Sequence, residues 1–317
     1  MNQAFDKTSY AVHENVYDNE RSHSLAPAWM TEGTIDAWRH TQMYQCLDPL
    51  LGQVGGSRWL TVGDGRCGTD AHYLEQHGMD ALASDISDTM LRVAHSHGYI
   101  REYKKENAEK LTFADESFDF VLCKEAYHHF PRPMVALYEM IRVARRGVIL
   151  IEPDDSAILM DGRHLLKMIT KAAMLRLGMG RIFGSTDTSI IDNGSNWYEE
   201  VGNYGYAISK REIEKVALGL NYPHVAFRGL NDAYIAGGEH ESLLGDSPML
   251  RELSREINEM DRHAKRGLSR GRHKLLVAII FKEEIGGNLR DSLTAGMFDV
   301  RDMPRNPYAA SLASEPR

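Results

Sequence analysis

Short apolar segments alternate with amphipathic segments through the middle of the chain. The apolar segments have the length and the β-branched content of buried parallel strands, and they comprise residues 59–62, 81–84, 118–123 and 148–151. The segments between them place apolar side chains at helical spacing, and they comprise residues 69–77, 87–99 and 134–147. Strands that alternate with helices predict an α/β fold with a doubly wound parallel sheet.

The first 57 residues show no strand pattern and are predicted to form an N-terminal helical cap. Residues 2–21 are polar and are expected to be extended or loosely helical. Thr34 is a favourable N-cap for a helix whose apolar residues run from 35 to 51. This cap either packs on the sheet edge or covers a ligand pocket, for which the aromatic candidates are Tyr10, Trp29 and Trp38.

The last third of the chain carries a second set of elements. Residues 209–212 (S-K-R-E) form a capping box that opens a helix. Residues 224–234 and 274–283 have the composition of two strands, and the charged, helix-like stretch 249–265 lies between them. Residues 285–317 contain Gly, Pro and Ser and are predicted to form an arm or tail, which could reach a second subunit of a homodimer.

A glycine turn lies between the strand 59–62 and the helix that follows it. Gly63, Gly65 and Gly68 let the backbone turn tightly and let a ligand lie against peptide N–H groups at a helix N-terminus. Asp85, at the end of the next strand, is placed to accept hydrogen bonds from the two hydroxyls of a ribose. The stretch predicts a nucleoside-binding site, and by itself it leaves NAD, S-adenosylmethionine (SAM) and an unrelated glycine loop open.

Composition narrows the class of protein. The 317 residues suffice for one large domain or two small ones, and the net charge of −8 argues against a protein that binds nucleic acid by neutralising phosphates. The three cysteines, Cys46, Cys67 and Cys123, lie far apart and indicate neither a zinc site nor a disulfide framework. A polar N-terminus and the shortness of every apolar run predict no signal peptide, no membrane span and a cytoplasmic location.

Three consecutive segments carry a family resemblance. Residues 106–119 (E-N-A-E-K-L-T-F-A-D-E-S-F-D), 126–133 (A-Y-H-H-F-P-R-P) and 134–147 (M-V-A-L-Y-E-M-I-R-V-A-R-R-G) resemble G-D-A-E-x-L-P-F-x-D-x-S-F-D, x-L-H-H-x-x-D-P and A-L-x-E-x-x-R-V-L-x-P-G. These patterns are typical of class I SAM-dependent methyltransferases of the ubiquinone-biosynthesis-like group, methyltransferase type 11. With the glycine turn, the resemblance covers residues 58–153.

The resemblance implies a Rossmann-like, seven-stranded sheet, mostly parallel, with a reversed terminal hairpin. The two late strands supply that hairpin, whereas an NAD-binding half would continue β-α-β, so SAM is the predicted cofactor and S-adenosylhomocysteine (SAH) its product. Residues 58–284 are then the methyltransferase domain, with 154–208 as a substrate-lid insertion. The predicted cofactor contacts are Gly63, Asp64, Gly65, Gly68, Asp70, Asp85, Ile86, Asn107, Ala108 and Lys124.

Two positions depart from the family pattern. Thr61 stands where an acidic residue usually precedes the first glycine, so Asp64 or Asp70 are the candidates to hold the cofactor's amino group. Asn107 replaces the usual aspartate that accepts a hydrogen bond from the adenine amino group, and its side-chain carbonyl still offers an acceptor.

His128 and His129 are the candidate general bases, because a hydroxyl acceptor must lose its proton as the methyl group arrives and histidine can hold a proton near neutral pH. Glu125 could assist or orient one of them. The alternative is that the histidines only shape their loop. A metal site built from His128, His129, Glu152 and Asp154 is conceivable, but no metal is predicted because nothing fixes the ligand spacing.

The insertion 154–208 joins aromatic and amide side chains to glycines, which suits a substrate lid. Its predicted substrate contacts are Tyr198, Asn203, Tyr204 and Tyr206. The predicted function is methyl transfer from SAM to a small polar molecule, with an oxygen of a sugar or glycan precursor as the first hypothesis. The alternatives are C- or N-methylation of a quinone or natural product, and a catalytically silent SAM-binding subunit.

Overall fold

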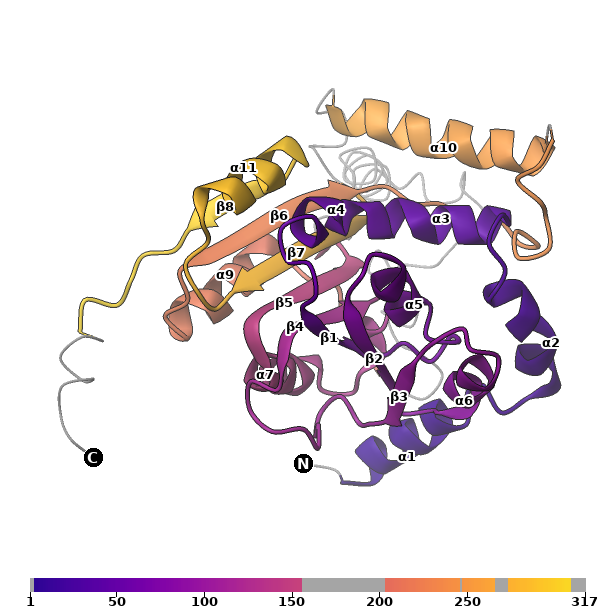
Figure 1. Cartoon of the computed structure of the whole chain (residues 1–317), viewed down its shortest axis with the longest axis horizontal. Helices are drawn as coiled ribbons and strands as arrows, with labels where there is room; N and C mark the ends of the chain where they lie inside the picture. The colour runs from indigo at the N-terminus through magenta and orange to yellow at the C-terminus, as the bar shows by residue number, and fades with distance from the viewer. Residues whose placement is uncertain (1–2, 156–202, 246, 266–272, 309–317) are drawn as a thin grey trace, which may run out of the picture.

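The computed structural model describes residues 3–155, 203–245, 247–265 and 273–308, arranged around one eight-stranded sheet (Figure 1). The strands follow the spatial order β3-β2-β1-β4-β5-β7-β6-β8. Their bounds are β1 Arg58–Val62, β2 Asp80–Asp85, β3 Glu102–Lys105, β4 Phe118–Lys124, β5 Ala144–Pro153, β6 His224–Leu230, β7 Leu275–Phe281 and β8 Asp299–Asp302.

The first five strands are parallel, and the last three are antiparallel to their neighbours. The predicted Rossmann-like α/β fold with a reversed terminal hairpin is therefore confirmed, since β6 pairs with β7 and β7 pairs with β5. The predicted count of seven strands is wrong, because β8 adds an eighth at the edge, beside β6.

The eighth strand comes from the region predicted to be an arm or tail. Leu289 and Leu293 of α11 (Gly287–Ala295) are buried, and the Oγ of Ser292 donates to the carbonyl oxygen of Pro49 at 2.8 Å. The helix thereby brings Asp299–Asp302 to the edge of β6. That strand has only four residues (D-V-R-D), of which three are charged, and it is held by backbone pairing, so its one apolar residue is too little to reveal a strand.

Helices cover both faces of the sheet. They are α1 Gln3–Glu14, α2 Glu20–Trp29, α3 Ile35–Tyr44, α4 Asp48–Leu51, α5 Thr69–Gln76, α6 Thr89–Ser96, α7 Pro133–Val143, α9 Lys210–Gly219, α10 Pro248–Lys265 and α11. Apolar side chains of α4, α5, α6 and α11 pack on one face, and those of α7 and α9 pack on the other. Neighbouring residues of β1 show this alternation, because Trp59 faces the first cluster and Leu60 the second.

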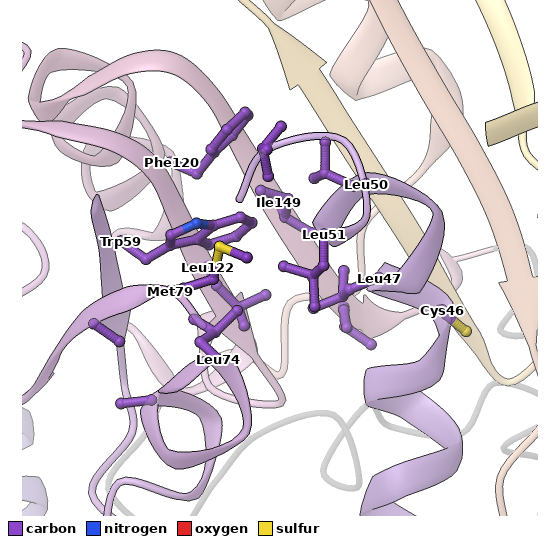
Figure 2. Close-up of a cluster of buried hydrophobic side chains, with 14 of the residues drawn as sticks. Cys46, Leu47, Leu50, Leu51, Trp59, Leu74, Met79, Phe120, Leu122 and Ile149 are labelled. Carbon is purple, nitrogen blue, oxygen red and sulfur yellow. The ribbon is translucent and has the colours of Figure 1, made fainter. Parts of the chain in front are cut away.

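Trp59 lies at the centre of the first cluster (Figure 2). Its ring stacks on Phe120 of β4 with a centroid separation of 4.8 Å, and its Nε1 donates to the Oγ of Ser57 at 2.7 Å. The indole is fully buried and its one polar group is hydrogen-bonded. The ring therefore holds β1 against β4 without leaving a buried donor unpaired. This packing holds the strand that ends in the glycine turn.

The N-terminal region is helical, as the spacing predicts, and the predicted N-cap is confirmed. The hydroxyl of Thr34 accepts from the N–H of Ala37 at 3.1 Å and begins α3. The stretch 2–21 differs from the expectation of loose structure, because α1 begins at Gln3 and Asn19 caps α2 by accepting from the N–H of Ser22. The role of residues 1–57 as a separate cap stays a prediction.

Helix α10 extends the structure beside α3. Leu253 of α10, Ile35 of α3 and Ala233 form a small buried cluster, against which Trp38 and Ile257 pack. Figure 1 shows the two helices running alongside one another. The connection between β6 and β7 therefore supplies a helix that covers the N-terminal region.

The predicted lid insertion leaves and rejoins the sheet at one place. The N–H of Ile208 donates to the carbonyl oxygen of Pro153, and the N–H of Asp155 donates to that of Ile208, both at 2.9 Å. Most of the insertion, including Tyr198, lies outside the described residues.

Candidate active site

A cavity of about 270 Å³ lies at the carboxyl ends of the parallel strands. Gly63 lines it from the end of β1, Asp85 and Ile86 from the end of β2, Asn107 with Ala108 from the loop after β3, and Glu125 from the end of β4. Open α/β sheets bind their ligands at this edge. Five of the ten predicted cofactor contacts therefore meet in one cavity.

The glycine turn is built around a buried carboxylate. Asp64 accepts from the N–H of Asp70 at 3.1 Å and from that of Ala71 at 3.0 Å, and the hydroxyl of Thr61 donates to it at 2.8 Å. Because these bonds satisfy the N–H groups that open α5, Asp64 is the cap of that helix. It does not belong to the cavity lining, and Thr61 acts here by holding it.

Asp70 and Lys124 form a buried ion pair instead of lining the cavity. The ammonium of Lys124 lies 3.3 Å from Oδ1 of Asp70, and the hydroxyl of Tyr44 donates to the same oxygen at 2.7 Å. Burial raises the pKa of Asp70, although Lys124 opposes the rise. Burial also disfavours the charged lysine, but the carboxylates of Asp70 and Glu125 raise its pKa overall. Gly65 and Gly68 likewise belong to the turn behind the cavity, and the direct cofactor contacts of these four residues stay predictions.

Asp85 connects the turn to the cavity. The N–H of Gly65 donates to Oδ2 of Asp85 at 3.0 Å, and the N–H of Ser87 donates to Oδ1 at 2.7 Å. A Cβ on residue 65 would overlap the carboxylate and the ring of Tyr17, so only glycine allows this approach. Burial raises the pKa of Asp85 to about 6, against the effect of the two N–H donors.

Cofactor affinity is expected to depend on pH through Asp85. The ionised carboxylate is the stronger acceptor for ribose hydroxyls, and with a pKa of about 6 it is about 10% ionised at pH 5. SAH is therefore expected to bind about tenfold more weakly at pH 5 than at pH 7.5, and Asp85→Asn should remove this dependence.

At pH 7.5, Asp85→Ala should reduce the binding free energy by about 1–3 kcal/mol. Calorimetric titration checks both, and an unchanged affinity in Asp85→Ala would show that the carboxylate does not contact the ribose.

The first helix covers the cavity from the opposite side. The lining residues that it and the following turn supply are Ser9, Tyr10, His13, Val16 and Tyr17. Tyr10 is held there by a buried carboxylate, because its hydroxyl donates to Glu109 at 2.7 Å. Arg132 joins both, since Nε donates to Glu109 at 2.6 Å and its NH2 group donates to the Tyr10 oxygen at 2.7 Å.

Of the three aromatic candidates in the N-terminal region, only Tyr10 belongs to this cavity lining. Trp29 and Trp38 line a separate cavity of about 360 Å³ between α3 and α5. Sequence reasoning missed His13 and Tyr17, although a signal was present. Positions 10, 13 and 17 follow helical spacing and place rings on one face of an otherwise polar segment.

The two histidines have different surroundings. His129 lines the cavity, and its ring centroid lies 6.0 Å from that of His13 and 4.0 Å from that of His128. His128 instead faces the fully buried Glu152, whose Oε2 lies 2.7 Å from Nδ1 of the ring. Since an ionised carboxylate only accepts, Nδ1 of His128 carries a proton.

Glu152 shapes the loop that carries the histidines. Its Oε1 accepts from the N–H groups of Ala126 at 2.8 Å and Tyr127 at 2.9 Å, where a short 3₁₀ helix begins. The sequence raised Glu152 only as a metal ligand, and the structure gives it a positioning role. Across the described ranges, no group of three or more His, Cys, Asp or Glu side chains is arranged to hold a metal ion.

The described members of the predicted lid lie beside the cavity and outside its lining. Asn203 is buried, and its Nδ2 donates to the Oγ of Ser9 and to the carbonyl oxygen of His129, both at 2.8 Å. Tyr206 packs against the ring of Tyr127 at 5.9 Å and donates its hydroxyl to Glu212. Tyr204 is 45% exposed. Their contacts with a substrate stay predictions, and Asn203 is the one that touches two cavity residues.

A Rossmann-like sheet with a glycine turn after β1 and a carboxylate at the end of β2 defines a nucleoside-cofactor-binding domain. Residues 60–151 match the family model described as a methyltransferase domain, of the type 11 group. The match over this segment agrees with the methyltransferase family that the sequence motifs resemble. Within the parts of the chain that the structure covers, no helix has the length and apolar character needed to cross a bilayer.

Curated relatives match this chain over part of their length. A demethylmenaquinone methyltransferase of Renibacterium salmoninarum is 35% identical over 106 residues, which are 33% of this chain and 44% of the relative. A demethylmenaquinone methyltransferase of Beutenbergia cavernae is 27% identical over 151 residues, 48% of this chain and 60% of the relative. The chain thus spans about half the length of these relatives.

Among solved structures, the magnesium protoporphyrin IX methyltransferase of Synechocystis with bound SAM is 13% identical to this chain. The comparison covers 86% of this chain and 96% of the other, with a TM-score of 0.46.

Proposed function

We propose that this protein transfers a methyl group from SAM to a small polar molecule. One observation carries the proposal: the cavity within the methyltransferase domain gathers Asp85, Asn107 and His129 on one ligand-sized surface. A carboxylate suits a ribose diol, an amide suits the edge of an adenine, and an imidazole suits proton transfer near neutral pH. The donors and acceptors of the lining therefore fit SAM.

The cofactor supplies an electrophilic methyl group on a sulfonium, and the chain supplies position and proton transfer. Asp85 accepts from the ribose, and the side-chain oxygen of Asn107 can accept from an adenine amino group while it also accepts from the N–H of Glu109 at 2.9 Å. Helix α1, held by the Tyr10–Glu109–Arg132 contacts, excludes water from this side. His129 takes the proton of an acceptor hydroxyl.

For the acceptor we propose an oxygen of a sugar or glycan precursor. One support is the histidine on the cavity wall, because a hydroxyl acceptor needs a base. The other is the amide and aromatic side chains of residues 203–206 beside it. The second candidate is a carbon of a quinol, favoured by the names of the two curated relatives. A silent SAM-binding subunit is the third, and the placement of His129 at the cavity argues against it.

Two measurements test the proposal. Calorimetry of the purified protein with SAH and with NAD decides the cofactor, and tighter binding of NAD would overturn the assignment. Incubation with methyl-labelled SAM and two acceptor panels, nucleotide sugars and reduced quinones, decides the acceptor by mass spectrometry of the products. Transfer to quinols alone would replace the sugar hypothesis, and SAH binding without transfer to either panel would favour the silent subunit.

A further inference from the structure

A buried cluster of charged side chains lies behind the cavity wall and joins α3 to the strand ends. Its carboxylates are Asp36, Asp70, Glu125 and Asp232, and its basic side chains are Arg39, His40, Arg66 and Lys124. The contacts described under the proposed function use none of these groups, although Asp70 and Lys124 are among the predicted cofactor contacts. A charge that is not paired within the cluster is available to a ligand.

Three carboxylates of the cluster each have a close cationic partner. Arg39 donates from Nε to both oxygens of Asp232 at 2.8 Å. Arg66 donates to Asp36. Lys124 lies 3.3 Å from Asp70. These pairs balance three positive charges against three negative ones.

His40 adds no charge to the cluster. The NH1 group of Arg66 lies 2.8 Å from Nε2 of His40, and the ammonium of Lys124 lies 3.3 Å from Nδ1. Both cations can only donate, so a ring protonated on both nitrogens is disfavoured. Burial, together with the nearby charges of Lys124, Arg66 and Arg39, lowers the pKa of His40 well below its usual value. The imidazole is therefore neutral near pH 7.

Glu125 is left as the excess negative charge. It shares cations that already have partners, with Arg39 at 3.3 Å and Lys124 at 3.7 Å, and the Nδ1 of His40 lies 3.8 Å away. The Glu125–Arg39 distance equals that of the Lys124–Asp70 pair, and the other two distances are longer than those of the three pairs. The formal charges of the four acidic and three cationic side chains sum to −1, and Glu125 is the one of the four carboxylates that lines the cavity. Asp64 is left out of this sum, because burial and the neighbouring Asp70 raise its pKa well above its usual value.

The backbone holds Glu125 beside the glycine turn. Its φ of +50° is a left-handed conformation that a non-glycine residue adopts at some cost, as is common where a site requires it. The next residue, Ala126, lies so close to Gly63 that a Cβ on residue 63 would overlap it. The carboxylate is thus fixed next to the turn against which the amino-acid part of the cofactor is expected to lie.

We propose that Glu125 binds the α-ammonium group of SAM, an inference that rests on the proposed function. The two residues first expected to hold this group have other tasks, since Asp64 caps α5 and Asp70 pairs with Lys124. An ammonium at Glu125 brings the cluster to neutrality. The contact also explains how a chain with Thr61 at the end of β1 holds the charged end of its cofactor.

The test compares two ligands that differ in the amino-acid part. SAH carries the ammonium, whereas 5′-methylthioadenosine has the same nucleoside and thioether without it. Glu125→Gln is expected to weaken SAH about 10- to 100-fold, the usual effect of losing one charge-assisted hydrogen bond. Binding of 5′-methylthioadenosine should stay within about twofold, which also shows that the variant retains its pocket. Calorimetry measures both.

Glu116→Gln is the matched control, because Glu116 is also a glutamate at positive φ, 56°, and it is exposed, lies outside the cavity lining and has its carboxylate 3.3 Å from Lys282. It should leave both affinities unchanged. A second measurement changes the ligand instead: the wild-type protein should bind the deaminated analogue of SAH about 10- to 100-fold more weakly than SAH, and Glu125→Gln should bind the two alike.

Equal weakening of SAH and 5′-methylthioadenosine in Glu125→Gln, or no weakening of SAH, would overturn the assignment of Glu125. A wild-type protein that binds neither ligand would instead overturn the proposed function, so the two failures are distinguishable. Both outcomes are read from the same calorimetric titrations.

Discussion

Gly63→Ala is expected to destabilise the protein by about 2–5 kcal/mol and to weaken SAH binding at least about 100-fold. The added Cβ would overlap the Cβ of Ala126, and the residue adopts a φ of +80° that alanine disfavours. Both strands that carry the cavity wall, β1 and β4, would have to separate. Chemical denaturation and calorimetry with SAH measure the two effects.

Two variants separate the two causes of the lost stability, backbone strain and the overlap with Ala126. Gly56→Ala places alanine at a φ of +72° where nothing lies within 4 Å, so it should cost only the backbone strain, about 1–2 kcal/mol. The double variant Gly63→Ala with Ala126→Gly removes the overlap and should regain the difference. If Gly63→Ala is no less stable than Gly56→Ala, the contact with Ala126 does not constrain the turn.

His129→Ala is expected to lower turnover about 10²- to 10⁴-fold when the acceptor is a hydroxyl. The affinity for SAH should be nearly unchanged, because the lost group acts on the acceptor. The residual rate should rise with pH, since hydroxide or ionised acceptor replaces the base. Steady-state kinetics from pH 6 to pH 9 measure these effects.

His128→Ala is the comparison for the neighbouring ring. It leaves the buried Glu152 with one hydrogen-bond donor fewer, so it should reduce the free energy of unfolding by about 1–3 kcal/mol. If both single variants keep near-normal turnover with the true acceptor, the histidines only shape the loop. Proximity alone would then suffice, which favours nitrogen or carbon as the acceptor atom.

The sequence predicts those parts of the site whose chemistry is local. Gly63 and Asp85 were recognisable because a turn followed by a helix, and a carboxylate one strand later, imply a position at the sheet edge before any contact is known. The Thr34 cap was recognisable because it needs only the N–H group three residues on. Gly63 and Asp85 come from such signals, whereas Ile86, Asn107 and Ala108 come from the family resemblance.

Residues whose partners are distant in the sequence make contacts that the sequence did not predict. Asp64 and Asp70 have the right residue type to hold an amino group, but α5 and Lys124 engage them. That Glu125 assists or orients a histidine stays a prediction, and the structure adds its contacts with Arg39 and Lys124. The carboxylate's role depends on which cations the fold brings near it, and Arg39 comes from a helix 86 positions earlier in the chain.

By itself, the sequence determined the strand-and-helix alternation, and its motifs predicted the family whose model residues 60–151 match and the edge of the sheet that carries the candidate site. The alternation follows from periodicity, glycine and proline, which act within a few residues of chain, whereas the family follows from the resemblance of the motifs. Only the tertiary structure decided that β8 closes the edge, that Glu152 holds the histidine loop, and that Glu125 carries the unbalanced charge. Edge pairing and the balance of buried charges depend on groups that are far apart in the sequence, so no local sequence pattern predicts them.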